Sequence, residues 1–234
     1  MSTALEMFAP DVWVKKYPIR YSGCTFPALM TVIRLKSGRL LIHSPCEIDS
    51  QTKAEIADLG PTAFIVAPGT YHYLHVISCQ KAFPDAKTFL CPGIERKRPE
   101  IPFDGILDGN AQPEWDAELD QVLVEGSRFI WEVAFLHRAS RTLILVDLIE
   151  NIGDSTPGTN WVLKFFWKVV FRMWNRPKPA PEYQFGWKDK TAASRSLSRI
   201  LSWNFERVLI AHGEPIVTDA KETLRKAWQG VLDG

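Results

Sequence analysis

The chain has 234 residues, of which 46% are hydrophobic and 24% are charged, as in an ordinary folded globular protein. This composition excludes a disordered or fibrous chain. The 28 basic residues nearly balance the 27 acidic ones, so no overall positive field is present to hold a polyanion, and we expect no nucleic-acid partner.

Location and domain organisation follow from what the sequence does not contain. The first residues lack a basic segment followed by an apolar one, and no stretch of about 18 apolar residues is free of charge. The cysteines form neither a CxxC pair nor a small disulfide framework; they are Cys24, Cys46, Cys79 and Cys91. We therefore expect a cytoplasmic protein with one domain over residues 1–234.

The first half of the chain predicts a hairpin and then alternating helices and strands. Residues 29–44 contain two β-rich runs around Gly38, whose backbone freedom suits a tight antiparallel turn. Next come a helix over 51–59, a buried strand over 63–67, a helix over 72–83 and a strand over 88–91. Residues 95–112 are rich in proline and charge, which predicts an extended surface loop.

The second half of the chain predicts another group of strands followed by helices. The pattern gives strands over 121–124, 129–136 and 142–147, a helix over 189–203, a strand over 207–211 and a terminal helix over 219–232. Two groups of strands, each accompanied by helices, predict an α/β protein with two sheets back to back and helices outside.

Metal-binding or acid-base side chains occur directly after apolar runs or within them. His72 and His75 follow FIVAPGTY, Glu132 lies in WEVAFLHR, Asp147 ends TLILVD and His212 lies at the end of VLIAHG, just before its glycine. Because the ends of several strands can meet at one edge of a rigid sheet, these side chains are candidates for a shared site.

These segments resemble a known family. VAPGTYHYLH, EVAFLHRASRTLILVDLIEN and LIAHGEPI are similar to the metallo-β-lactamase-like hydrolase fold, and more narrowly to its DUF4336 branch. The resemblance extends from about Thr31 to Leu232 and implies a four-layer αββα sandwich.

The resemblance also implies a reduced metal site. In the wider family a THxHxDH loop supplies most ligands of a two-zinc centre. Pro68 and Thr70 stand here where its first two histidines would be, and His72 falls at the aspartate position. Asp147 matches the family's bridging aspartate and His212 its late histidine. The implied site binds one divalent metal (Zn, Fe or Mn) through His72, Asp147 and His212, with His75 or Glu132 as a further ligand.

The function implied by this site is metal-dependent hydrolysis of an ester, lactone, thioester or phosphoester in a small-molecule substrate. Asp147 or Glu132 would orient the attacking water as the catalytic residue. A non-catalytic module that binds a ligand or partner on the same scaffold is the alternative. Each residue also has a purely structural interpretation: the histidines can cap a helix, and a buried Glu132 can pair with Arg138 or Arg141.

An aromatic-basic segment interrupts the second half of the chain. Residues 161–176 read WVLKFFWKVVFRMWNR, with Lys164, Lys168, Arg172 and Arg176 at every fourth position, which predicts a helix with one basic stripe. We expect a helical insert around residues 160–186. Three interpretations fit: a helix covering the site, a homodimer face, or an interfacial helix of a peripheral membrane protein.

Overall fold

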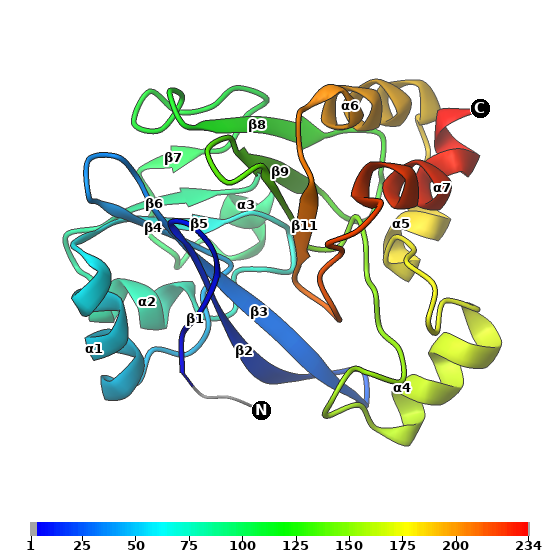
Figure 1. Cartoon of the computed structure of the whole chain (residues 1–234), viewed down its shortest axis with the longest axis horizontal. Coiled ribbons are helices and arrows are strands. Elements are labelled where there is room, and N and C mark those ends of the chain that lie inside the picture. The colour runs from blue at the N-terminus through cyan, green and yellow to red at the C-terminus, as the bar shows by residue number, and fades with distance from the viewer. Residues whose placement is uncertain (1–3, 234) are drawn as a thin grey trace.

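The computed structural model describes residues 4–233 and contains two β-sheets packed face to face, with helices on their outer sides (Figure 1). The first sheet has seven strands in chain order: β1 Glu6–Ala9, β2 Val12–Tyr21, β3 Cys24–Arg34, β4 Leu40–His43, β5 Thr62–Ala67, β6 Lys87–Leu90 and β7 Gly105–Ile106. The second has the order β11-β10-β9-β8, with β8 Leu119–Val124, β9 Glu132–His137, β10 Thr142–Leu145 and β11 Arg207–Ile210. The predicted four-layer sandwich is confirmed.

The helices fall into three groups. Those following strands of the first sheet are α1 Ser50–Leu59, α2 Val76–Ala82 and α3 Ile94–Lys97. Those packed with the second sheet are α5 Pro181–Gly186, α6 Lys190–Ser202 and α7 Ala220–Leu232. In the chain between β10 and α5, the segment α4 Trp161–Phe165 continues into the π-helix η1 Phe166–Val170, which forms the third group. No helix within residues 4–233 combines the length and the apolar character needed to cross a bilayer.

Alternation along the strands of the second sheet builds two separate cores. In β9, Val133 and Phe135 pack with residues of the first sheet, whereas Ala134 and Leu136 pack with α6 and α7. Successive side chains of a strand point to opposite faces, so one apolar run can cover both layers. All six residues of β9 are buried, as expected for a sheet covered on both sides.

Local signals in the first half of the chain produce the predicted elements. The hairpin expected over residues 29–44 is the antiparallel pair of β3 and β4, with Gly38 at a φ of 80°. Asp49 caps α1 by accepting a hydrogen bond from the Thr52 backbone N–H, and Gly60 follows the helix. These elements are confirmed because their turn and capping residues act locally.

Two predictions in this half are wrong in part. The helix expected over residues 72–83 begins only at Val76, because the chain from Tyr71 to His75 forms turns after β5. The loop expected over residues 95–112 contributes β7, which pairs in parallel with β6 and forms the edge of the first sheet. Only two residues pair there, too few to give a periodic pattern.

The aromatic-basic segment is helical for ten residues rather than sixteen. The five-residue α4 becomes the π-helix η1, in which the Phe171 backbone N–H donates to the Phe166 carbonyl. The helix ends before Arg172, which has a φ of 52° in the left-handed region. Asn160 anchors the start of the segment: its side chain accepts from the Leu163 and Thr25 backbone N–H groups.

Candidate metal centre

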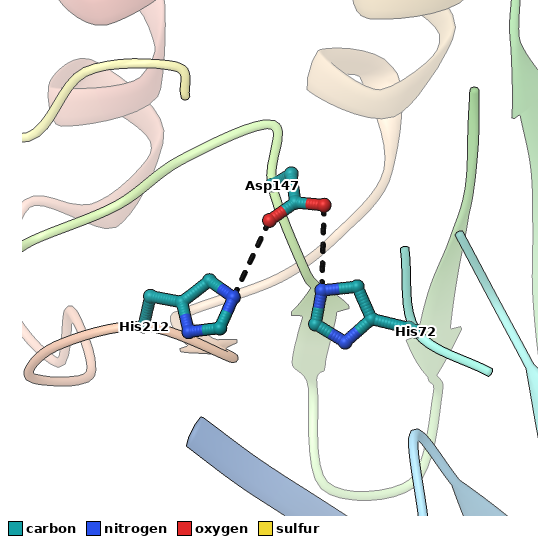
Figure 2. A group of neighbouring side chains, drawn as sticks. All are labelled: His72, Asp147 and His212. Carbon is teal, nitrogen blue, oxygen red and sulfur yellow. Dashed lines mark ion pairs between the residues drawn. The ribbon is translucent and has the colours of Figure 1, made fainter. Parts of the chain in front are cut away.

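Three of the predicted side chains lie together in one cluster (Figure 2). His72 comes from the turns after β5, Asp147 from the chain just after β10, and His212 from the chain just after β11. Their candidate ligand atoms all lie within 4.8 Å of one another. The two sheets therefore deliver three strand ends to one point.

The carboxylate of Asp147 lies between the two imidazoles. His72 Nε2 lies 3.3 Å from Asp147 Oδ2, and His212 Nε2 lies 3.4 Å from Asp147 Oδ1. Two ligand atoms each about 2.05 Å from one zinc ion at the tetrahedral angle are about 3.3 Å apart. The observed separations match that spacing and exceed the roughly 2.7–2.9 Å of a charge-assisted hydrogen bond.

Each histidine is held through its other ring nitrogen. His212 Nδ1 lies 3.2 Å from the Pro27 carbonyl oxygen, which can only accept, so Nδ1 carries the proton. His72 Nδ1 pairs with the Ser44 hydroxyl at 2.7 Å. Both Nε2 atoms thus point at Asp147, the arrangement of metal-binding histidines whose second nitrogen is fixed by an oxygen. The donor set fits a divalent metal.

Charge is balanced within this buried cluster. Burial alone would raise the pKa of Asp147, but the neighbouring His72 and His212 outweigh it and hold that pKa well below its usual range. Burial alone would lower the pKa of His212, yet the Asp147 carboxylate beside it, together with the charge of Glu150, raises it. Asp147 is therefore ionised and available as a ligand at neutral pH.

Glu132 lies beneath the cluster instead of in the pocket. It is fully buried; Oε1 accepts from the Val146 backbone N–H at 2.7 Å, and Oε2 accepts from Asp147 and Leu148 at 2.8 Å each. These contacts hold the turn that carries Asp147. A carboxylate whose two oxygens are occupied by backbone donors has no direct route to a water in the pocket, so Glu132 is a positioning residue.

His75 lies outside the cluster. Its Nδ1 is 3.1 Å from Glu47 Oε2, and its ring meets Tyr17 edge to face at 5.6 Å between centroids. In the helix predicted over residues 72–83, His72 and His75 would lie three positions apart and so on one face. Because α2 begins at Val76, the two side chains diverge.

Pro68 and Thr70 both make structural hydrogen bonds. The Pro68 carbonyl accepts from the Val133 backbone N–H at 2.7 Å, and the Thr70 hydroxyl accepts from the Trp131 backbone N–H at 3.2 Å. Both contacts attach the loop after β5 to the start of β9. Within residues 4–233 the structure offers one group of three metal-capable side chains.

A pocket of about 600 Å³ opens onto the centre and is lined by all three of its side chains. Aromatic and aliphatic groups form most of its wall, including Phe26, Tyr71, Ile130, Phe166, Trp167 and Phe171. Phe26 meets the His212 ring edge to face at 5.0 Å between centroids. The arrangement suits a substrate that carries a substantial apolar part.

Sequence reasoning missed two residues near the centre. Glu150 lines the pocket and accepts from Trp167 Nε1 at 3.0 Å; burial raises its pKa to about 8, although the charge of His212 opposes this. Ser44 has a φ of 54° and follows β4 directly. Glu150 follows Asp147 by three positions, a spacing that could have drawn attention to it, whereas nothing in the sequence distinguishes Ser44 from a turn serine.

Comparison with known proteins places this geometry in a family. The sequence profile of DUF4336, described as a domain of unknown function, matches residues 12–165, more than half of the chain. The chain belongs to the DUF4336 family. No curated protein sequence matches it.

Solved structures show which fold this DUF4336 member adopts. The DIM-1 metallo-β-lactamase exposed to ceftazidime is similar with a TM-score of 0.66 at 13% identity, covering 97% of this chain and 96% of that chain. A metallo-β-lactamase from Erythrobacter litoralis gives 0.65 at 14% identity, covering 98% and 94%. FIM-1 from Pseudomonas aeruginosa in its mono-zinc form gives 0.65 at 11%, covering 98% and 96%. The fold is metallo-β-lactamase-like over nearly the whole chain.

Proposed function

We propose that this DUF4336 protein is a metal-dependent hydrolase with one divalent ion held by His72, Asp147 and His212. The observation that carries the proposal is the orientation of both Nε2 atoms toward Asp147 at metal-ligand spacing, with each Nδ1 held by an oxygen. Three protein ligands plus an open position characterise catalytic zinc sites, whereas structural zinc sites have four protein ligands. The mono-zinc form of a protein with the same fold supports this stoichiometry.

The chain's own residues define the chemistry. A metal held there would supply a Lewis acid and a bound water of lowered pKa. Glu132 keeps Asp147 in place through the backbone of residues 146–148. Glu150 lines the pocket, where burial raises its pKa, so its carboxyl group is placed to exchange a proton with a leaving group. Ester, lactone, thioester and phosphoester bonds all fit this division of roles.

A serine hydrolase is the competing chemistry, since Ser44, His72 and Asp147 form a chain of polar contacts. Ser44 is 1% exposed and does not line the pocket, so its hydroxyl does not meet a substrate. The same serine acts well as the oxygen that fixes His72.

Metal titration tests the proposal. We expect about one zinc, manganese or iron per chain by elemental analysis, and calorimetric binding that is lost in His72→Ala, His212→Ala and Asp147→Asn. His75→Ala is the matched control, because that histidine lies outside the cluster. Hydrolysis of nitrophenyl esters, lactones, thioesters or phosphodiesters should follow metal content across the same variants.

The contrary outcomes are equally defined. Protein that binds none of the three metals and keeps its stability in chelator would support a non-catalytic binding module. Metal binding without hydrolysis of any of the four bond classes would support the metal centre and contradict the hydrolase function.

A further inference from the structure

An exposed apolar face borders the pocket on the α4–η1 segment. It consists of Trp161, Phe165, Phe166, Val169, Val170 and, from α5, Phe185, and is called the aromatic face below. Trp161 is 77% exposed and Phe185 68%, values unusual for such large apolar side chains. In Figure 1 α4 lies at the periphery of the molecule, where its buried side packs against the start of β3 and its other side is left uncovered. Such a patch marks an interaction site.

Basic side chains accompany the aromatic face. Residues 155–181 contain five basic and no acidic residues, although the whole chain is nearly neutral. Asp154, just before this stretch, lies near Lys164 and Lys168 and offsets part of their charge. Lys164, Lys168, Arg172 and Arg176 are all exposed. Two of them make cation–π contacts with the same ring: Lys164 Nζ and Lys168 Nζ lie 5.9 and 4.9 Å from the Trp174 ring centroid.

We propose that the aromatic face and the basic residues that accompany it dock onto an anionic lipid bilayer. Lys164 and Lys168 lie on the helical part of the segment, and Arg172 and Arg176 follow it. Exposed tryptophan and phenylalanine beside lysine and arginine are the composition of helices that lie in the membrane interface. The ten helical residues are too few to span a bilayer, so the segment lies on the surface. In a two-fold dimer through this face, the basic residues of one chain would lie against those of the other. Repulsion between these like charges disfavours a second chain as the occupant.

Docking places the pocket at the membrane. Phe166 belongs to the aromatic face and also lines the pocket, and Phe171, 6.2 Å from Phe185 between ring centroids, lines it as well. Trp167 continues the wall inward, from its hydrogen bond with Glu150 to Phe26 beside His212. An amphiphile entering from the bilayer would meet apolar side chains from the surface to the centre. This substrate class rests on the proposed hydrolase function.

Vesicle co-sedimentation of the full chain tests the docking without any turnover. We expect binding to phosphatidylcholine vesicles that contain phosphatidylglycerol, little binding to phosphatidylcholine alone, and weakening as salt rises. Phe165→Ser/Val169→Ser should weaken binding at least about 10-fold through lost apolar contact. Lys164→Gln/Lys168→Gln should do so through lost charge. Met7→Ser/Val217→Ser is the control, because those apolar side chains are comparably exposed outside the aromatic face.

Several results would overturn the proposal. Equal binding to neutral and anionic vesicles would show that attraction to anionic lipid does not contribute to binding. Equal binding by all variants would show that the aromatic face is not the binding surface. A dimer that dissociates in Phe165→Ser/Val169→Ser, without any vesicle binding by the parent protein, would assign the face to self-association. Thermal unfolding of each variant shows that it remains folded.

The substrate class has a separate test. If hydrolysis is found, long-chain esters should be preferred over short-chain esters, and anionic vesicles should lower the KM for the long-chain ester only. Equal preference would reject the amphiphile while leaving vesicle binding intact. Absence of all hydrolysis would reject the hydrolase, and the docking result would still stand on sedimentation.

Discussion

At the scale of single residues, two oxygen atoms set the direction of the two histidines. The Pro27 carbonyl and the Ser44 hydroxyl hold Nδ1 of His212 and His72, leaving Nε2 to face Asp147. Because a neutral imidazole has only one N–H, fixing one nitrogen defines what the other can do. The residues that select the chemistry of the centre are therefore partly residues that a substrate does not touch.

Replacing Ser44 tests this dependence. We expect Ser44→Ala to weaken metal binding roughly 10- to 100-fold, because His72 loses the partner that orients it. Ser140→Ala is a close control. The buried Ser140 hydroxyl lies 2.7 Å from His137 Nδ1, the same distance as between Ser44 and His72, but in the turn after β9, at the opposite end of that strand from Glu132. Calorimetric titration should show weaker binding only for Ser44→Ala, and equal affinities in both variants would contradict the assigned role.

Glu132 gives a second prediction at this scale. In the parent protein, three backbone N–H groups donate to the two carboxyl oxygens of Glu132. Glu132→Gln replaces one of these oxygens by an amide NH₂, which cannot accept. We expect the free energy of unfolding to fall by about 1 to 3 kcal/mol, as for a buried donor left without an acceptor. Glu125→Gln, at an exposed position just after β8, should change it by less than about 0.5 kcal/mol. Denaturant unfolding measures both.

At the scale of elements, the ends of strands decide where the ligands stand. Gly213 follows His212 with a φ of 103°, and a Cβ atom there would lie 2.1 Å from the Asn151 carbonyl oxygen. The same turn pairs the Asn151 backbone N–H with the His212 carbonyl at 3.0 Å. The end of β11 is thus locked to the chain that follows Asp147, and only glycine permits that approach.

Gly213→Ala should therefore damage both stability and the centre. We expect a loss of about 2 kcal/mol from the strained backbone and a further shift of His212 that weakens metal binding. Gly230→Ala in α7 is the control, since a Cβ there meets nothing within 4 Å and alanine favours a helix. Thermal melts with and without metal distinguish the two, and a Gly213→Ala protein that binds metal normally would show that the turn can relax.

How far the sequence predicts these elements depends on whether their cause is local. The capped helix α1 and the turn at Gly38 were predictable because Asp49 and glycine act within a few residues. The start of α2 was not, since the turns before it are held by contacts of Thr70 with the backbone of Trp131, sixty-one positions away in sequence. For that reason the position of His75 could not be predicted, whereas His72, Asp147 and His212 lie together because each follows a strand that ends at this edge of the sandwich.

At the scale of the whole molecule, a buried histidine makes stability depend on pH. His43 is fully buried against Phe135, its Nε2 has no hydrogen-bond partner in the described structure, and burial, together with nearby His72, lowers its pKa from 6.5 to about 3. A depressed pKa means that the unfolded chain takes up the proton first. Stability from this group is therefore complete above about pH 6.5 and falls as pH drops toward 3.

We therefore predict a specific slope of the free energy of unfolding against pH. Between pH 6 and pH 4 the His43 contribution should fall by roughly 1.4 kcal/mol per pH unit at its steepest. His43→Leu should remove that part of the slope while other titrating groups keep theirs, so the difference between the two unfolding curves isolates it. Parallel pH profiles for the two proteins would show that His43 is protonated equally in the folded and unfolded chain.

The three candidate ligands also lie far apart in the chain and on both sheets, with His72 after β5 and Asp147 and His212 after strands of the second sheet. An ion held there would act as a reversible cross-link between the two halves of the sandwich. Such a link restricts the unfolded chain more than a local one would, because the loops that it closes are long. Removal of the ion would then weaken the contacts between the two sheets first. Limited proteolysis would detect that local opening without an assay of activity.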